Sequence, residues 1–197
     1  MTILTLAGSP SSRSRSSALL RHAIQRLAQR GLGVREAGLR DIPAEELIEG
    51  HYASPAAAAL RRRVDAADAV LISTPVYKAS FAGGLKAVLD LLDEKALADK
   101  IVLPIATGGS PAHLLALEYS LKPVLSALGA RHILAGVYAT DKQVHFDEDG
   151  LVHIDDDVRR RLDDAVDRVY RHVAPEGVAG ASAVDLGRLA ADGRLGV

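Results

Sequence analysis

Short apolar runs alternate with amphipathic segments five times along the first 173 residues of this chain. The apolar runs are residues 3–7, 69–73, 101–106 and 132–138, and a more polar run at residues 33–37 takes the second position. Apolar residues recur at helical spacing within residues 19–27, 56–66, 85–92, 111–128 and 155–173. Apolar strands that alternate with helices form a parallel sheet covered on both faces, joined by right-handed crossovers. The pattern predicts an α/β fold: a five-stranded parallel sheet with helices on both faces.

The length of 197 residues suits a single domain, which we assign to residues 1–173. Residues 41–54 show no periodicity, and we expect an irregular connection there. Residues 174–197 are rich in glycine and alanine and have little pattern. We expect them to form a C-terminal tail that is flexible or partly ordered against a neighbouring subunit.

The charge balance argues against nucleic acid and membranes as partners. There are 24 basic and 25 acidic residues, a net charge of −1, so no sequence-wide field attracts a polyanion. No segment has the roughly 18 continuous apolar residues that would span a bilayer, and the N-terminus lacks the pattern of a signal peptide. These features predict a cytoplasmic protein.

The absence of cysteine limits the chemistry further. It removes disulfides, thiolate nucleophiles and cysteine-ligated metal centres. The seven histidines are scattered without the spacing of metal ligands, so no metal site is expected. Any redox activity must therefore come from a bound cofactor.

The loop after the first strand is rich in hydroxyl groups. Five of the eight residues from Ser9 to Ser16 are serines, and Arg13 and Arg15 lie among them. The next helix adds free N–H groups and a partial positive charge at its N-terminus. The loop lacks both the three spaced glycines of a dinucleotide fingerprint and the lysine of a P-loop. It favours a terminal phosphate, and the alternative is that its serines only cap the helix.

Two further loops are expected at the same edge of the sheet, where ligands of open parallel sheets bind. The loop after the third strand, residues 74–86, carries Tyr77 among proline and small residues, which would suit a flat heterocycle. A plain turn with Tyr77 packed over it is the alternative. The loop after the fourth strand, residues 107–110, contains two glycines, which let the backbone approach a planar ring closely.

Several stretches resemble the NADPH-dependent FMN reductases that supply reduced flavin to two-component alkanesulfonate monooxygenases. The resemblance covers roughly residues 1–173 and rests on LAGSP with the following RSRSS, on TPVYKASFAG, and on ATGGSPAHLLALEYSLKPVLSALGA. It implies a flavodoxin-like fold, binding of FMN and NADPH, and a flavin-dependent monooxygenase as partner.

The resemblance also assigns binding residues. It implies that the FMN phosphate is held by Ser9, Arg15, Ser16 and Ser17. It implies that the ribityl chain and ring are lined by Pro75, Val76, Tyr77, Lys78 and Ser80, with Gly108, Gly109 and Ser110 at the other edge. Ser11 stands where the family often has an arginine, which leaves Arg13 as an alternative to Arg15.

We expect no catalytic side chain. Hydride passes directly between NAD(P)H and the flavin, and the protein stacks the rings and excludes water. Two alternatives remain. One is an NAD(P)H quinone or azo reductase that retains FMN. The other is a flavodoxin-type electron carrier, against which the net charge of −1 argues, since such carriers tend to be strongly acidic.

Pro123 constrains the segment 111–128. A proline inside a helix cannot donate to the carbonyl four residues earlier, here that of Tyr119, and its ring presses on that carbonyl. The helix must kink there or widen into a π-type bulge, a feature frequent at functional sites. The resemblance implies that Tyr119 marks such a bulge at a subunit interface and keeps flavin exchange open. A surface kink with an ordinary tyrosine is the alternative.

The same segment predicts a homo-oligomer, either a dimer or a tetramer. Its leucines supply more apolar width than one core-facing stripe requires: Leu114, Leu115, Leu117 and Leu121.

Overall fold

The structure is a computed structural model and describes residues 1–174. The strands are β1 (Thr2–Ala7), β2 (Gly33–Gly38), β3 (Ala69–Tyr77), β4 (Ser80–Phe81), β5 (Ile101–Gly108), β6 (His132–Ile133), β7 (Val137–Thr140), β8 (Val144–Phe146) and β9 (Val152–Ile154). The α-helices are α1 (Arg15–Gln29), α2 (Ala44–Ile48), α3 (Pro55–Asp65), α4 (Gly83–Leu89), α5 (Lys122–Ala127) and α6 (Asp156–Val173). Short 3₁₀ turns form η1 (Leu39–Asp41) and η2 (Pro111–Leu114), and η3 (Leu117–Leu121) is a π-helix.

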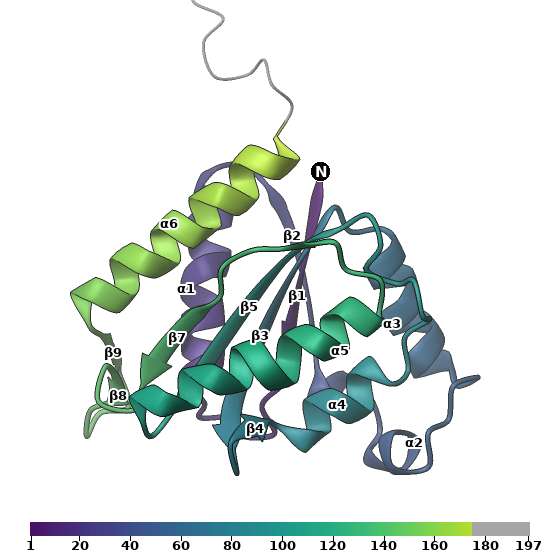
Figure 1. Cartoon of the computed structure of the whole chain (residues 1–197), viewed down its shortest axis with the longest axis horizontal. Helices are drawn as coiled ribbons and strands as arrows, with labels where there is room; N and C mark the ends of the chain where they lie inside the picture. The colour runs from purple at the N-terminus through teal and green to yellow at the C-terminus, as the bar shows by residue number, and fades with distance from the viewer. Residues whose placement is uncertain (175–197) are drawn as a thin grey trace, which may run out of the picture.

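The predicted α/β architecture is confirmed. The main sheet has the order β2-β1-β3-β5-β6, and its long strands pair in parallel (Figure 1). The chain runs from β1 outward to β2 and then crosses back to β3 on the other side of β1. The strand order therefore reverses between β1 and β3, which is where open parallel sheets bind their ligands.

The sheet has seven strands instead of the expected five. The fifth position is divided into β6 and β7, both of which pair with β5. Backbone N–H and C=O groups of alternate residues face the same neighbour. The carbonyl of Val102 in β5 accepts the N–H of Leu134, so Val102 faces β6. Pro104, two residues later, faces the same side. Because proline has no N–H, it cannot donate a hydrogen bond to the neighbouring strand there. The seventh strand is β4, which folds back onto β3 in an antiparallel hairpin.

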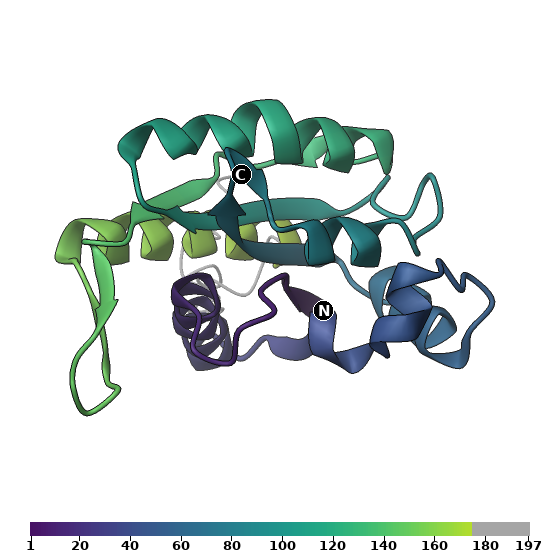
Figure 2. The ribbon, with the colours of Figure 1, turned by 90° about the horizontal axis from the view of Figure 1, so that it is seen from below.

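Helices cover both faces of the sheet, and each face has its own core. Figure 2 shows the sheet with α5 on one side and α6 and α1 on the other. One core is formed with α3, α4, η3 and α5, and the other with α1 and α6. The fully buried side chains include Leu4 and Leu85 in the first core and Leu71 and Leu103 in the second. No helix within residues 1–174 is long and apolar enough to cross a membrane.

Several boundaries differ from the sequence expectations. The connection 41–54 contains α2, with η1 just before it. β3 does not end at Ser73 but continues through Pro75 to Tyr77, because Pro75 pairs with Thr107 of β5 without needing to donate there. Strands β8 and β9 form a separate antiparallel hairpin that projects from the body of the fold (Figure 2). The tail expected at residues 174–197 lies, apart from Ala174, outside the described residues.

The segment 111–128 is not one regular helix. It begins as the 3₁₀ turn η2, widens into the π-helix η3 and ends as α5. Of the two possibilities at Tyr119, kink or bulge, the structure has the π-type bulge. Widening the turn ahead of Pro123 moves the Tyr119 carbonyl away from the proline ring and relieves the clash. Tyr119 itself is 79% exposed.

Candidate functional site

Three loops that are far apart in the sequence meet in one pocket at the carboxyl edge of the sheet. This central pocket has a volume of about 190 Å³ and lies at the point where the strand order reverses. The first loop, the end of β3 and the end of β5 contribute most of its walls. The lining residues are Ser9, Ser11, Arg13, Ser14, Arg15, Pro75, Val76, Tyr77, Thr107, Gly108, Gly109 and Asp141.

The first loop presents a polar wall to this pocket. Ser14 caps α1, its hydroxyl accepting the N–H of Ser17 at 3.3 Å. The hydroxyl of Ser9, which is only 5% exposed, accepts the N–H of Ser11 at 3.2 Å, which holds the loop in a tight turn. The wall therefore combines hydroxyl groups with the positive end of a 15-residue helix, an arrangement that binds anions.

Both arginines of the loop are held by the β8–β9 hairpin. The Arg15 Nε donates to the Val144 carbonyl at 2.9 Å. The Arg13 guanidinium lies 4.9 Å from the centre of the Phe146 ring and donates to the Asp147 carbonyl at 3.1 Å. A guanidinium fixed in this way loses less entropy when it binds a phosphate. The hairpin thus keeps two cations beside the first loop, and sequence reasoning had not predicted this hairpin.

The second wall is the end of β3 and its hairpin with β4. Pro75 and Val76 line the pocket, and Tyr77 stands 51% exposed at its rim. The turn consists of Lys78 and Ala79, whose φ angles of 51° and 61° are both left-handed. Such a turn folds the chain back sharply, so Lys78 and Ser80 do not line the central pocket. Ser80 instead forms a hydrogen bond of 2.6 Å with Ser120 of η3.

The third wall is the glycine loop after β5. A Cβ at Gly108 would lie 2.9 Å from the Tyr138 hydroxyl and 3.1 Å from both His113 and Val76, so any larger residue would have to displace these side chains. At Gly109 the nearest atom to an added Cβ is an Asp141 carboxylate oxygen at 3.8 Å. Backbone is therefore exposed at Gly109 with open space beside it, a surface that a flat group can approach closely.

Tyr138 supports the glycine loop from beneath. Its hydroxyl donates to the Ser110 carbonyl, and it is 8% exposed. Burial raises the pKa of Tyr138, and the nearby carboxylate of Asp141 raises it further. The phenol therefore stays protonated and keeps donating to Ser110, which fixes the loop. Ser110 caps η2 and is not among the residues that line the central pocket.

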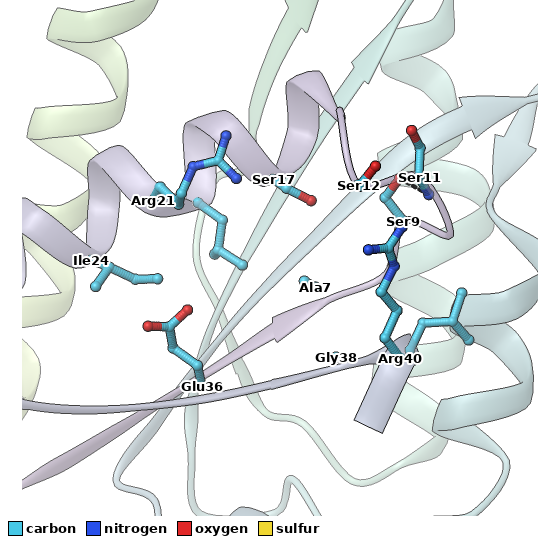
Figure 3. A pocket seen from close by; sticks show the side chains of 12 residues that line it. Ala7, Ser9, Ser11, Ser12, Ser17, Arg21, Ile24, Glu36, Gly38 and Arg40 are labelled. Carbon is cyan, nitrogen blue, oxygen red and sulfur yellow. Dashed lines mark hydrogen bonds between the residues drawn. The ribbon is translucent and has the colours of Figure 1, made fainter. Parts of the chain in front are cut away.

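A second pocket lies on the other side of the first loop, between α1 and β2. This outer pocket has a volume of about 210 Å³ and shares Ser9 and Ser11 with the central one. Figure 3 shows Ser17 and Arg21 on α1 at one wall and Glu36 and Arg40 at the other. Arg40 donates to the Pro10 carbonyl at 3.0 Å and so braces the loop from this side. The outer pocket receives only the first of the three loops.

The residues predicted for the site do not all line the same pocket. The central pocket brings together Ser9, Arg15, Pro75, Val76, Tyr77, Gly108 and Gly109. Ser17 lines the outer pocket, and Ser16 is fully buried with its hydroxyl 3.0 Å from that of Ser14. Asp141 was missed, although an acidic residue three positions after the fifth apolar run was a usable signal. Within residues 1–174 no cluster of three or more His, Asp or Glu side chains could hold a metal ion.

Comparisons with known proteins identify relatives of the chain. A family model described as NADPH-dependent FMN reductase matches residues 1–145. The chain is 53% identical over 148 residues to an FMN reductase (NADPH) of Pseudomonas putida, covering 75% of each. It is 49% identical over 144 residues to an FMN reductase (NADPH) of Escherichia coli, covering 73% of this chain and 75% of the relative. A solved NADH:FMN oxidoreductase in its apo form superposes with a TM-score of 0.78 at 35% identity, over 89% of this chain and 91% of the other.

Proposed function

We propose that this chain, which belongs to the NADPH-dependent FMN reductase family, releases the reduced FMN that it forms. In this proposal the reduced FMN serves a flavin-dependent monooxygenase in sulfonate sulfur acquisition. The observation that supports FMN as the molecule bound is the meeting of three loops in the central pocket. The serine- and arginine-rich first loop lines the same cavity as the β3 wall with Tyr77 and the glycine loop. We place the whole activity in a single domain, residues 1–173.

The residues of the central pocket fit FMN. The first loop offers the FMN phosphate hydroxyl groups, two arginines and the N-terminus of α1. The bare backbone at Gly109 and the Val76 side chain form walls between which a flat ring can lie. At about 190 Å³ the pocket is smaller than the roughly 300–1,000 Å³ of pockets that enclose small ligands. Tyr77, exposed at the rim, would extend the surface available to a ring that this volume does not enclose.

Bound FMN supplies the redox chemistry, accepting hydride from NAD(P)H. The chain's own residues bind and orient the two partners. Arg13 and Arg15 neutralise the phosphate, and the Gly108–Gly109 backbone sets how deeply the ring can sit. No side chain of the pocket is required as a general base, because no proton has to be removed from carbon for hydride to move. The central pocket needs to provide orientation and shelter from water.

The proposed function predicts a purified protein that is colourless and oxidises NADPH only when FMN is added. A colourless protein is expected because a flavin that serves as substrate dissociates between turnovers. A quinone reductase would instead purify yellow and reduce quinones without added FMN, and a flavodoxin-type carrier would not oxidise NADPH. Absorbance at flavin and NADPH wavelengths during turnover distinguishes these outcomes.

A homo-oligomer remains a prediction, and the structure refines its basis. Leu117 and Leu121 are buried in the core of the subunit, so they cannot serve an interface. Leu114 and Leu115 are 42% and 55% exposed, and together with the exposed Tyr119 they give the segment that follows the glycine loop apolar side chains for an interface. We expect light scattering at micromolar concentration to report a multiple of 20.8 kDa and Leu115→Lys to reduce that mass. A monomer under all conditions would contradict the prediction.

Tyr119 is proposed to keep flavin exchange open at that surface. Its side chain stands out from the π-helix η3, whose Ser120 is tied to the β3–β4 hairpin by the bond to Ser80. We expect Tyr119→Ala to slow FMN release about 2- to 10-fold, the range that one aromatic contact provides. Stopped-flow dilution measures the release rate.

Tyr52→Ala is the matched control, since Tyr52 is also exposed, at 59%, and lies outside the central pocket. It should leave FMN release unchanged. A Tyr119→Ala protein that purifies colourless and turns over free FMN at the parental rate would remove the proposed role.

A further inference from the structure

Asp141 is an acidic side chain inside the proposed flavin pocket. It directly follows β7, and its N–H donates to the Gly108 carbonyl at 3.0 Å, which fixes its backbone against the glycine loop. Its carboxylate lies 3.7 Å from the Arg15 guanidinium and is 46% exposed. The other carboxylate oxygen faces the open space beside Gly109. The negative charge of Asp141 therefore lies between Arg15 of the first loop and Gly109 of the glycine loop.

This placement opposes the binding of a phosphate in two ways. A carboxylate in the pocket repels the phosphate dianion directly, because like charges at short range raise the free energy of the complex. It also competes for Arg15, whose Nε is already committed to the Val144 carbonyl. Of the two guanidinium nitrogens that remain available for phosphate, Nη1 is the one that lies 3.7 Å from the Asp141 carboxylate.

Arg13, which also lines the central pocket, offsets this competition only in part. Its guanidinium stacks on Phe146 and donates to the Asp147 carbonyl, on the hairpin side of the loop. The central pocket therefore holds two cations and one anion where tight retention of a dianion would favour cations alone. A protein that must release its flavin in every catalytic cycle benefits from such a weakened site.

We propose that Asp141 sets the rate of flavin exchange by weakening the hold of Arg15 on the FMN phosphate. This inference rests on the proposed function, since it concerns release of the same flavin from the same pocket. Asp141 acts through charge and through Arg15, and it has no part in hydride transfer.

The test is Asp141→Asn, which keeps the shape and removes the charge. FMN should bind about 3- to 10-fold more tightly and dissociate correspondingly more slowly, the size expected for removing one partly exposed like charge. Riboflavin, which lacks the phosphate, should bind both proteins equally. Flavin fluorescence quenching gives the affinities and stopped-flow dilution the release rates. At 1 M salt the difference between parent and variant should shrink, because salt screens exposed charges.

The control is Glu94→Gln, which makes the same change in net charge at an exposed residue in the segment between α4 and β5, at the opposite edge of the sheet. It should leave FMN affinity unchanged. Asp141→Ser provides a second neutral variant if the asparagine protein unfolds at a lower temperature than the parent. Both variants are compared with the parent at matched folded fractions.

Three outcomes would overturn the inference. FMN binding that weakens or stays the same in Asp141→Asn would show that Asp141 only positions Arg15. An equal gain for riboflavin would show that Asp141 acts on the ring or the ribityl chain. A parent protein that binds no FMN would instead contradict the proposed function, so the two failures are distinguishable.

Discussion

Replacing Ser9 and Arg15 together with alanine is expected to weaken FMN binding by roughly 100-fold or more, because each charge-assisted hydrogen bond to a phosphate contributes about 1.5–3 kcal/mol. Both residues line the central pocket. Ser9 lies in the loop before α1, and Arg15 is the first residue of α1. The fold should survive, since the Arg15 side chain is 42% exposed and the Ser9 hydroxyl holds only one loop N–H. Fluorescence titration with FMN measures the loss, and circular dichroism checks the fold.

Two comparisons sharpen this experiment. Riboflavin affinity should change little in the double variant, because the lost contacts are to the phosphate. Ser16→Ala is the matched serine variant, since Ser16 is fully buried and its hydroxyl forms a hydrogen bond with the Ser14 hydroxyl. It should weaken FMN binding less than Ser9→Ala does. An FMN affinity that is unchanged in the double variant would remove the phosphate-loop assignment.

The division of the neighbouring serines between two pockets has a simple geometric cause. Successive residues of an α-helix point about 100° apart, so Ser16 and Ser17 leave the helix in different directions. In the first turn of α1, Ser16 therefore faces the interior, whereas Ser17 faces the outer pocket. Family resemblance named both residues without distinguishing their directions. The helix phase could have been set from Leu19, Leu20 and Ala23, which mark the buried face of α1.

The alternation of strands and helices was sufficient to predict the α/β fold and the edge of the sheet where the three loops meet. It did not predict the β3–β4 hairpin. Two-residue hairpin turns with left-handed residues are normally signalled by glycine or asparagine. Lys78 and Ala79 occupy the turn here, so the signal was missing, and the pairing of Val76 with Phe81 holds it in place.

The β8–β9 hairpin escaped prediction for a different reason. Its strands have only three residues each, too short for a period-two pattern to be distinguished from a polar loop. The hairpin nevertheless determines where Arg13 and Arg15 lie, through contacts that join residues more than 120 positions apart in the sequence. Side-chain contacts at such separations are set by tertiary packing, which local patterns do not contain.

The close packing at Gly8 provides the last prediction. Gly8 directly follows β1 and begins the first loop, and its N–H donates to the Ser73 carbonyl at 2.8 Å. A Cβ on Gly8 would lie 2.8 Å from that same carbonyl oxygen and 2.8 Å from the Leu85 Cβ. Neither atom is the end of a flexible side chain, so backbone or α4 must move to make room.

We expect Gly8→Ala to lower the free energy of unfolding by about 1–3 kcal/mol, the usual cost of overpacking a well-filled site. For a chain of this size that corresponds to a decrease of roughly 2–12 °C in the midpoint of thermal unfolding. FMN affinity should also fall, because any shift at Gly8 displaces Ser9 and the loop behind it. Gly83→Ala is the control, since an added Cβ meets nothing within 4 Å there and the residue lies in the first turn of α4. Alanine at Gly83 should leave stability unchanged or raise it by up to about 1 kcal/mol. If both variants unfold at the parental temperature, the contact between the end of β1 and α4 is looser than the structure shows, and the phosphate loop does not depend on glycine at this position.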